Sequence, residues 1–305
     1  MLQSILADIR REFSFGNVVT RLVIINVCVF IAVNLLRLGF YLGNAGIIPP
    51  LYRDILNFFS VSSELMHNLT HPWVFVTSIF LHEGFWHLLW NMLFLYWFGR
   101  IVGDLLGDRK VFPIYLLGGM VGCFVFWASA QLLPYLGGSV GYAMGASAGV
   151  MAIVVTAGMI APDYIIRLLF IGEVKLKYVV AALVLLDLFA VAGNSNTGGH
   201  FAHIGGVIMG WLFVAQLQAG NDWSEGVNSI LDRLERFFTA EKVTVKSTKE
   251  AKLVVKHTYR KKDPEQFSDD EIQERVDQIL EKIKQKGYNS LSVEEKEFLN
   301  NASSR

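Results

Sequence analysis

The hydrophobic residues of this chain gather into long runs, and polar stretches separate the runs from one another. Runs of this length and apolarity are typical of helices that cross a membrane, because a lipid-embedded helix needs apolar residues on all of its faces. The pattern therefore predicts six membrane-spanning helices. Their expected ranges are 22–40, 78–98, 111–133, 147–161, 178–192 and 200–217.

The charged residues lie mainly in the C-terminal part of the chain. Of 27 basic and 27 acidic residues in 305, 16 basic and 17 acidic residues fall within 221–305. This distribution predicts an all-α polytopic membrane protein, a six-helix bundle that a soluble helical tail follows. The expected parts are an N-terminal segment (1–20), a membrane domain (21–218), an amphipathic helix with a charged linker (219–267) and a helical hairpin (268–305).

The lysine and arginine residues of the membrane domain predict its orientation. They precede the first span, link the second to the third, and link the fourth to the fifth, which places these three segments on one side. By the positive-inside rule, both termini are expected in the cytoplasm, and the setting expected is a bacterial inner membrane. The residues concerned are Arg10, Arg11, Arg21, Arg100, Arg109, Lys110, Arg167, Lys175 and Lys177.

The tail begins with an amphipathic segment, Trp223 to Phe238, whose apolar residues recur at helical spacing. Such a helix is expected to lie along the membrane surface, in contact with lipid. Two capping boxes follow, Ser268 with Glu271 and Ser292 with Glu295, and they predict the two helices of the hairpin.

A serine between glycines opens the fourth predicted span, in the sequence Gly145-Ala146-Ser147-Ala148-Gly149. Small residues around a serine often form only a helix-packing face. This span is short, however: its fifteen residues measure roughly 22 Å, against a hydrocarbon core of roughly 30 Å. Ser147 is therefore expected on the order of 8 Å below the outer membrane surface, in a pocket that water reaches.

A histidine in the sixth span could activate this serine, since a serine nucleophile needs an adjacent base. His203 precedes Gly206 and Gly210, and small residues four apart let two helices approach closely. We expect the Gly149 side of the fourth span as the contact, with His203 within hydrogen-bonding reach of Ser147. Alone, His203 could equally be a packing histidine.

The second span carries His87 and Asn91, one helical turn apart on one face. Polar side chains at membrane depth are costly unless they face a cavity or a partner. Both types can donate a hydrogen bond to an oxyanion, which acyl transfer at Ser147 would require. The alternative is a structural hydrogen bond between helices.

Other classes of function find less support in the sequence. Four histidines could hold zinc if they converged, but His82-Glu83 and His87 lack the H-E-x-x-H spacing of a zinc protease, so we expect no metal and no cofactor. Asp187 is expected to be structural or to handle protons, which leaves a small-solute transporter as an alternative. No basic stripe with interleaved aromatics indicates nucleic-acid binding. The cysteines, Cys28 and Cys123, lie in apolar runs and are expected to be buried and unpaired.

Three motifs together resemble the rhomboid family of intramembrane serine proteases: His82-x4-His87-x3-Asn91, Gly145-Ala146-Ser147-Ala148-Gly149, and Ala202-His203-x2-Gly206-x3-Gly210. The resemblance covers about residues 15–218. It implies that Ser147 is the nucleophile and His203 the general base, a dyad without an acidic member. His87, Asn91 and the Ser147 backbone N–H would form the oxyanion hole, and other proteins' transmembrane helices would be the substrates.

The resemblance also has a departure and an extension. The first loop lacks the Trp-Arg pair common in the family, because Val74 follows Trp73. The hairpin at 268–305 resembles a small domain appended to some bacterial rhomboids, where it could bind a cytoplasmic partner. An inactive rhomboid-like protein that binds membrane clients without cutting them is the main alternative function.

Overall fold

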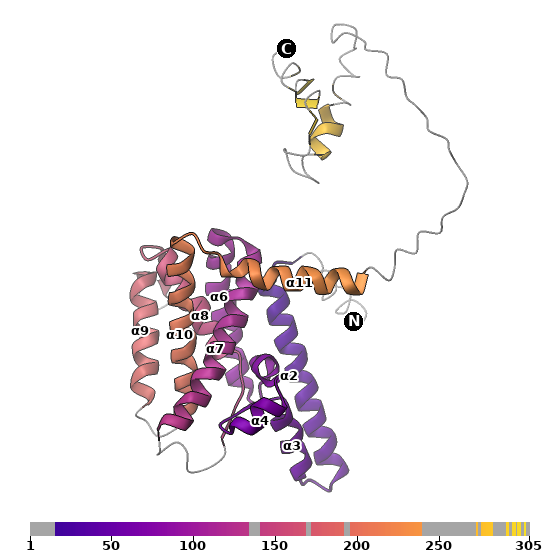
Figure 1. Ribbon diagram of the computed structural model, residues 1–305, viewed down its shortest axis with the longest axis vertical. Coiled ribbons are helices and arrows are strands. Elements are labelled where there is room, and N and C mark those ends of the chain that lie inside the picture. The colour runs from indigo at the N-terminus through magenta and orange to yellow at the C-terminus, as the bar shows by residue number, and fades with distance from the viewer. Residues whose placement is uncertain are drawn as a thin grey trace, which may run out of the picture. The chain divides into compact units, whose positions relative to one another are not determined.

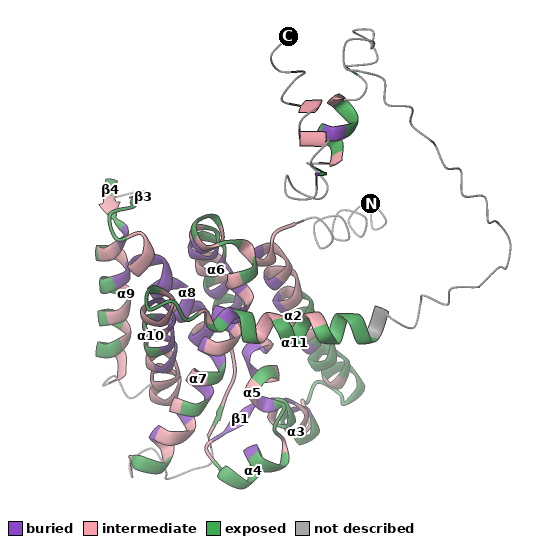
Figure 2. Ribbon diagram, turned by 45° about the horizontal axis from the view of Figure 1, so that its top comes forward, coloured by how far each residue is buried: buried purple, intermediate pink, exposed green. Residues whose placement is uncertain are grey.

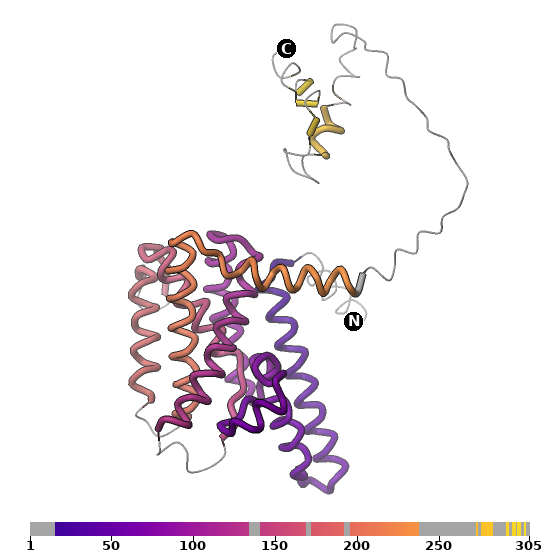
Figure 3. The backbone as a smooth tube through the Cα atoms, in the orientation of Figure 1, coloured from indigo at the N-terminus to yellow at the C-terminus, as the bar shows by residue number. Residues whose placement is uncertain are grey.

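The structure is a computed structural model that describes residues 16–133, 141–168, 172–191 and 196–239, with 273, 276–282, 291–292, 295–296, 298–299 and 302. The chain divides into two compact units, Met1–Val243 and Thr244–Arg305. The first unit is a bundle of helices, which Figure 1 shows in chain order by colour and Figure 3 shows as a backbone tube in the same orientation.

Six long helices build the described part of the first unit. They are α2 (Val18–Gly43), α6 (Phe85–Leu106), α7 (Val111–Leu132), α8 (Ser147–Ile160), α9 (Leu176–Ala190) and α10 (Thr197–Gln218). A seventh helix, α11 (Trp223–Thr239), runs across one end of the bundle (Figure 1).

Short elements fill the connections. Between α2 and α6 lie α3 (Pro50–Phe58), β1 (Val61–Ser62), α4 (Leu65–Thr70), α5 (Val74–Thr77) and the 3-10 turn η1 (Ser78–Phe80); η2 (Asp108–Lys110) joins α6 to α7. β1 pairs with β2 (Tyr142–Ala143), and β3 (Ile165–Leu168) pairs with β4 (Gly172–Lys175); both pairs are antiparallel. The connection between α2 and α6 is thus a series of short helices with one short strand.

The all-α bundle is confirmed, and the predicted boundaries of α7, α8 and α10 differ from the observed ones by at most three residues. The start of the second span is wrong. Residues 78–80 form a 3-10 turn, Leu81 and Gly84 are extended, and α6 begins only at Phe85. Residues 79–81 are apolar, but their backbone is not α-helical, and His82, which follows them, is buried.

Three described helices are long and apolar enough to cross a membrane: Val18–Gly43, the continuous helical stretch Asp108–Leu132, and Thr197–Gln218. Ser147–Ile160 is a shorter apolar helix. These helices make the chain an integral membrane protein, whereas the count of six spans stays a prediction. Large apolar side chains such as Leu35 and Leu42 of α2 and Phe189 of α9 are exposed, and lipid would cover them. Figure 2 shows exposed residues along both of these helices.

The central helix is α8, which contacts α6, α7, α9 and α10. Ten of its fourteen residues are buried. Glycines make this density possible: a Cβ on Gly210 would lie 2.5 Å from the Ala152 carbonyl oxygen, and one on Gly206 would overlap the Ala148 carbonyl. The expected contact at Gly149 is different, because a Cβ there would lie 2.5 Å from the Tyr115 carbonyl oxygen, so Gly149 faces α7 rather than α10.

Polar contacts gather at the end of the bundle that α11 crosses. The Val18 N–H, at the start of α2, donates to Asp108 at 2.8 and 3.0 Å. Arg109 donates to Asp232 of α11 at 2.8 Å, and Lys110 pairs with Asp222. The start of α2, the α6–α7 link and α11 therefore lie together.

The two cysteines were both expected to be buried, and the structure agrees for only one of them. Neither cysteine is paired; Cys123 is buried, but Cys28 is exposed on α2, so its expected burial is wrong. Asp163, between α8 and β3, accepts hydrogen bonds from Lys177 of α9 at 2.8 Å and from Lys175 of β4 at 2.9 Å, and these contacts lower its pKa to about 2.

The second unit is described in part. The Ser292–Glu295 capping box is confirmed, because the Glu295 N–H donates to the Ser292 hydroxyl at 3.2 Å and the Ser292 N–H donates to Glu295 at 2.7 Å. Lys282 also donates to Glu295, at 2.7 Å, and is the main reason that the pKa of Glu295 is lowered. Ile279 and Leu291 are buried. The linker at 241–267 and the capping box at Ser268 lie outside the described residues.

Candidate active site

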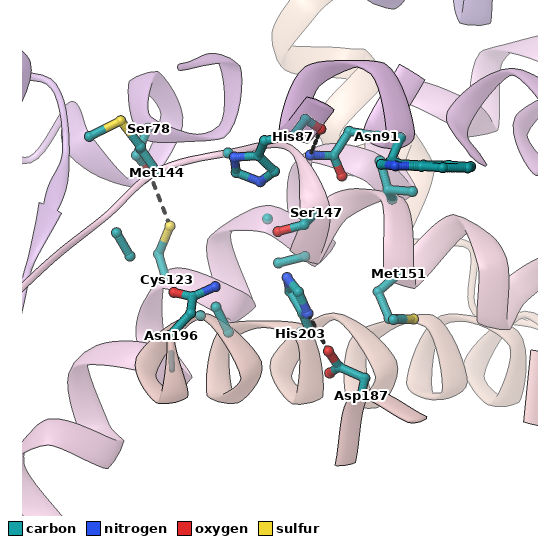
Figure 4. Close-up of a pocket in the computed structure, with 18 of the residues that line it drawn as sticks. Ser78, His87, Asn91, Cys123, Met144, Ser147, Met151, Asp187, Asn196 and His203 are labelled. Carbon is teal, nitrogen blue, oxygen red and sulfur yellow. Dashed lines mark hydrogen bonds and ion pairs between the residues drawn. The ribbon is translucent and has the colours of Figure 1, made fainter. Parts of the chain in front are cut away.

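A pocket of about 1100 Å³ opens into the first unit and brings together most of the polar residues that the sequence singled out. Residues of α6, α7, α8, α9 and α10 line it. Among them are Ser147, His203, His87, Asn91 and Asp187. Figure 4 shows Ser147 between His203 on one side and the His87–Asn91 pair on the other.

Ser147 is the first residue of α8, and the chain before it is tightly held. The Gly145 N–H donates to the Ser78 carbonyl at 2.8 Å, and Gly145 has a φ of +131°, which a side chain would strain. A Cβ at Gly145 would also lie 2.6 Å from the His87 ring. Glycine at this position therefore lets His87 approach the chain that carries the serine.

The amino end of α8 has no side-chain cap. The first N–H groups of a helix have no carbonyl partner within the helix, and the helix dipole adds partial positive charge there. Ser147 thus lies where backbone donors can stabilise an anion.

His203 lies on α10, about two turns after the helix begins. In Figure 4 its imidazole faces Ser147 with one edge and Asp187 with the other. The Nδ1 atom is 2.7 Å from Asp187 Oδ1, and the Nδ1 atom of His200 lies at the same distance from the same oxygen. The sequence did not predict this contact, because no motif surrounds Asp187 that would relate it to the sixth span.

Asn91 and His87 occupy one face of α6 toward the pocket, as their spacing predicts. The Asn91 amide nitrogen donates to the His87 carbonyl at 3.0 Å and lies 3.2 Å from His82 Nε2. Both amide hydrogens therefore have a partner in this structure.

His82 is a site residue that the sequence undervalued. It is fully buried, and its Nε2 atom lies 3.3 Å from the Ala146 N–H and 3.2 Å from the Asn91 amide. Because two N–H groups point at this nitrogen, Nε2 accepts and the ring hydrogen belongs on Nδ1. His82 thereby ties Asn91 to the loop before Ser147. Its place five residues before His87 was the available signal.

One described cluster could hold a metal ion: Asp187, His200 and His203 offer ligand atoms within 4.8 Å of one another. Hydrogen bonding alone also explains why these three side chains lie together. An ionised carboxylate only accepts hydrogen bonds, so two imidazole N–H groups on one oxygen satisfy all three side chains.

Comparison with known proteins agrees with these motifs. The family model described as the Rhomboid domain matches residues 69–219, and a family of unknown function matches residues 269–305. The chain is similar to Rhomboid-like protein 11, chloroplastic, of Arabidopsis thaliana, with 33% identity over 195 residues, 59% of this chain and 62% of the relative.

Two further relatives show lower coverage. The human Presenilin-associated rhomboid-like protein, mitochondrial, is 27% identical over 170 residues, 55% of this chain and 43% of the relative. Rhomboid protease GluP of Bacillus subtilis is 30% identical over 146 residues, 48% of this chain and 26% of the relative. The matches thus span less than two thirds of each of these relatives. Through the domain at residues 69–219, this chain belongs to the rhomboid family.

Proposed function

We propose that this protein is an intramembrane serine endopeptidase that cleaves the transmembrane segments of other proteins. One observation carries the proposal: Ser147, at the uncapped start of a buried helix, faces His203 inside a pocket that His87 and Asn91 also line. The family supports it, since Rhomboid protease GluP is a protease by name.

The arrangement of Ser147 and His203 suits peptide hydrolysis in two steps, acylation of the serine and then deacylation. The Ser147 hydroxyl oxygen attacks the peptide carbonyl carbon while His203 Nε2 takes the hydroxyl proton. The tetrahedral intermediate collapses, the C–N bond breaks, and His203 returns the proton to the departing amine. Water then attacks the Ser147 ester with His203 again as the base, which frees the second product and restores the serine.

The oxyanion of the intermediate needs donors on the side away from His203. The His87 ring lies in that direction (Figure 4), and the N–H groups at the uncapped start of α8 are next to Ser147. Asn91 contributes if its amide exchanges the bond to His82 for one to the oxyanion. Catalytic hydrogen bonds often tighten only when substrate is bound.

The wall of the pocket suits an apolar substrate. Trp86, Trp90 and Phe94 of α6 and Leu183 and Leu186 of α9 line it beside the polar residues. A transmembrane helix could lie against this wall with lipid-facing side chains, while a locally unwound stretch with small residues reaches Ser147.

We further propose that the α11 end of the bundle faces the cytoplasm and that the pocket opens toward the opposite side. The basic residues at the α6–α7 link and around β4 lie at the α11 end of the bundle, whereas α8 and α10 begin away from that end (Figure 1). The C-terminal unit, including residues 269–305, would then be available to a cytoplasmic partner.

The test is cleavage of a fluorogenic transmembrane peptide by the purified full-length protein in detergent, with Ser147→Ala as the control. Cleavage by wild type alone supports the proposal. Peptide binding without cleavage by a folded wild type would indicate the inactive client-binding alternative. Asp187-dependent ion flux in proteoliposomes without cleavage would indicate a transporter.

A further inference from the structure

We propose that Asp187 is a positioning residue for His203, so that the Ser147–His203 pair is held by an acidic third side chain on a neighbouring helix. The inference rests on the proposed function and deepens it. Asp187, His203 and Ser147 follow one another in Figure 4, from α9 through α10 to α8.

The hydrogen bond determines the form of the base. Asp187 Oδ1 is 2.7 Å from His203 Nδ1, and a carboxylate can only accept, so Nδ1 carries the hydrogen. The lone pair of a neutral imidazole then lies on Nε2, the nitrogen available to Ser147. During proton transfer the carboxylate also stabilises the imidazolium that forms.

The surroundings make this contact stronger than one at a surface. The side chain of Asp187 is 13% exposed and that of His203 is 18% exposed. The chain around Asp187 reads Val-Leu-Leu-Asp-Leu-Phe, and a carboxylate in such an apolar helix needs partners. Both partners come from α10, as the Nδ1–H groups of His200 and His203.

His200 provides an internal control. It donates to the same oxygen at 2.7 Å, but it is not among the residues that line the pocket. His200 therefore shares any purely structural role of the cluster, such as tethering α9 to α10, without access to Ser147. A positioning role predicts different kinetic effects for the two contacts, whereas a tether predicts similar ones.

The experiment uses the full-length protein with four variants: Asp187→Asn, Asp187→Glu, Asp187→Ala and His200→Gln. Turnover of a transmembrane peptide gives kcat and KM, a fluorophosphonate probe gives the rate of Ser147 labelling, and thermal melting gives Tm. An asparagine can present an N–H to His203 and favour the wrong tautomer, which costs about 10⁴-fold in a serine protease triad.

We expect Asp187→Asn to lower kcat and the labelling rate about 10²- to 10⁴-fold with KM within about threefold. Asp187→Glu should recover part of the loss, and His200→Gln should change kcat less than about fivefold. If Asp187→Asn does not fold, the inference requires slower labelling in Asp187→Glu at an unchanged Tm.

Three results would overturn the inference. Wild-type kcat in folded Asp187→Asn would remove any role in positioning, and equal losses in Asp187→Asn and His200→Gln that follow Tm would leave only a tether. Loss of wild-type activity in EDTA with recovery on added Zn²⁺ would instead make the cluster a metal site. If wild type itself neither cleaves nor labels at Ser147, the proposed function fails rather than this inference.

Discussion

α8 and α9 are adjacent helices of almost equal length, 14 and 15 residues, with opposite environments. α8 is buried between four other helices, and glycines on α10 pack against its backbone. On α9 only Leu176 and Val180 are buried, while Leu185, Leu186 and Phe189 are exposed.

The difference in burial between α8 and α9 matches the different roles proposed for Ser147 and Asp187. The proposed nucleophile, Ser147, begins a helix that other helices hold on every side, and its approach to His203 depends on close packing. Asp187 sits on the loosely packed helix, where two hydrogen bonds to α10 replace apolar contacts. Substitutions on α8 should therefore change the position of Ser147, whereas substitutions of Asp187 on α9 should change the protonation of His203.

The largest effect is expected from Ser147→Ala and His203→Ala. Each should abolish cleavage, lowering kcat by at least about 10⁴-fold, and the double variant should be no worse than either single one, because the residues act as a unit. Initial rates on the fluorogenic peptide, at matched folded concentrations, measure this. Additive losses would mean that the two side chains do not act on the same step.

Packing between α8 and α10 should be next in size. Gly206→Ala places a methyl group into the Ala148 carbonyl, which would cost about 1–3 kcal/mol of stability and displace His203 from Ser147. Gly39→Ala on α2 is the matched control, since nothing lies within 4 Å of a Cβ there, and it should stabilise by about 0.5–1 kcal/mol. Thermal melts and peptide turnover of both variants decide whether the contact is as tight as described.

Asn91→Ala should lower kcat roughly 10- to 1,000-fold with little change in KM, because an oxyanion donor acts mainly in the transition state. Asn34→Ala is the control: Asn34 donates to the Phe30 carbonyl at 2.9 Å, the same type of contact, but it is not a pocket residue. A fall in Tm with normal turnover per folded molecule would make Asn91 an interhelical strut instead.

The smallest effect is expected from the tail. A chain ending at Val243 should cleave the peptide like the full-length protein, because no residue of the site lies beyond it. A chain ending at Gly220 should still cleave but melt at a lower temperature. It loses the pairs Arg109–Asp232 and Lys110–Asp222, worth up to about 1 kcal/mol each. No cleavage by a folded Gly220 chain would mean that α11 completes the enzyme.

The sequence predicted the helices where apolar runs have clear ends. The limits of α7, α8 and α10 follow from such runs, and the start of α6 does not, because the apolar run continues through 78–81 while the backbone changes from a 3-10 turn to an extended form. Hydrophobic periodicity alone cannot distinguish an α-helix from a short apolar stretch with 3-10 or extended backbone.

The same limit applies to the site. Ser147, His203, His87 and Asn91 were predictable because a motif marks each of them. The contact of His82 with Ala146 and that of Asp187 with His203 join residues 64 and 16 positions apart, and only tertiary packing creates them.

The most direct test of the central assignment is mass spectrometry of the purified protein after reaction with a fluorophosphonate probe. An activated serine reacts with such a probe, whereas an ordinary hydroxyl does not. We predict one added label, on Ser147, that is absent in Ser147→Ala and at least about 10³-fold slower in His203→Ala. An unlabelled wild type that is folded, or a label on Ser147 that forms equally fast without His203, would contradict the assignment.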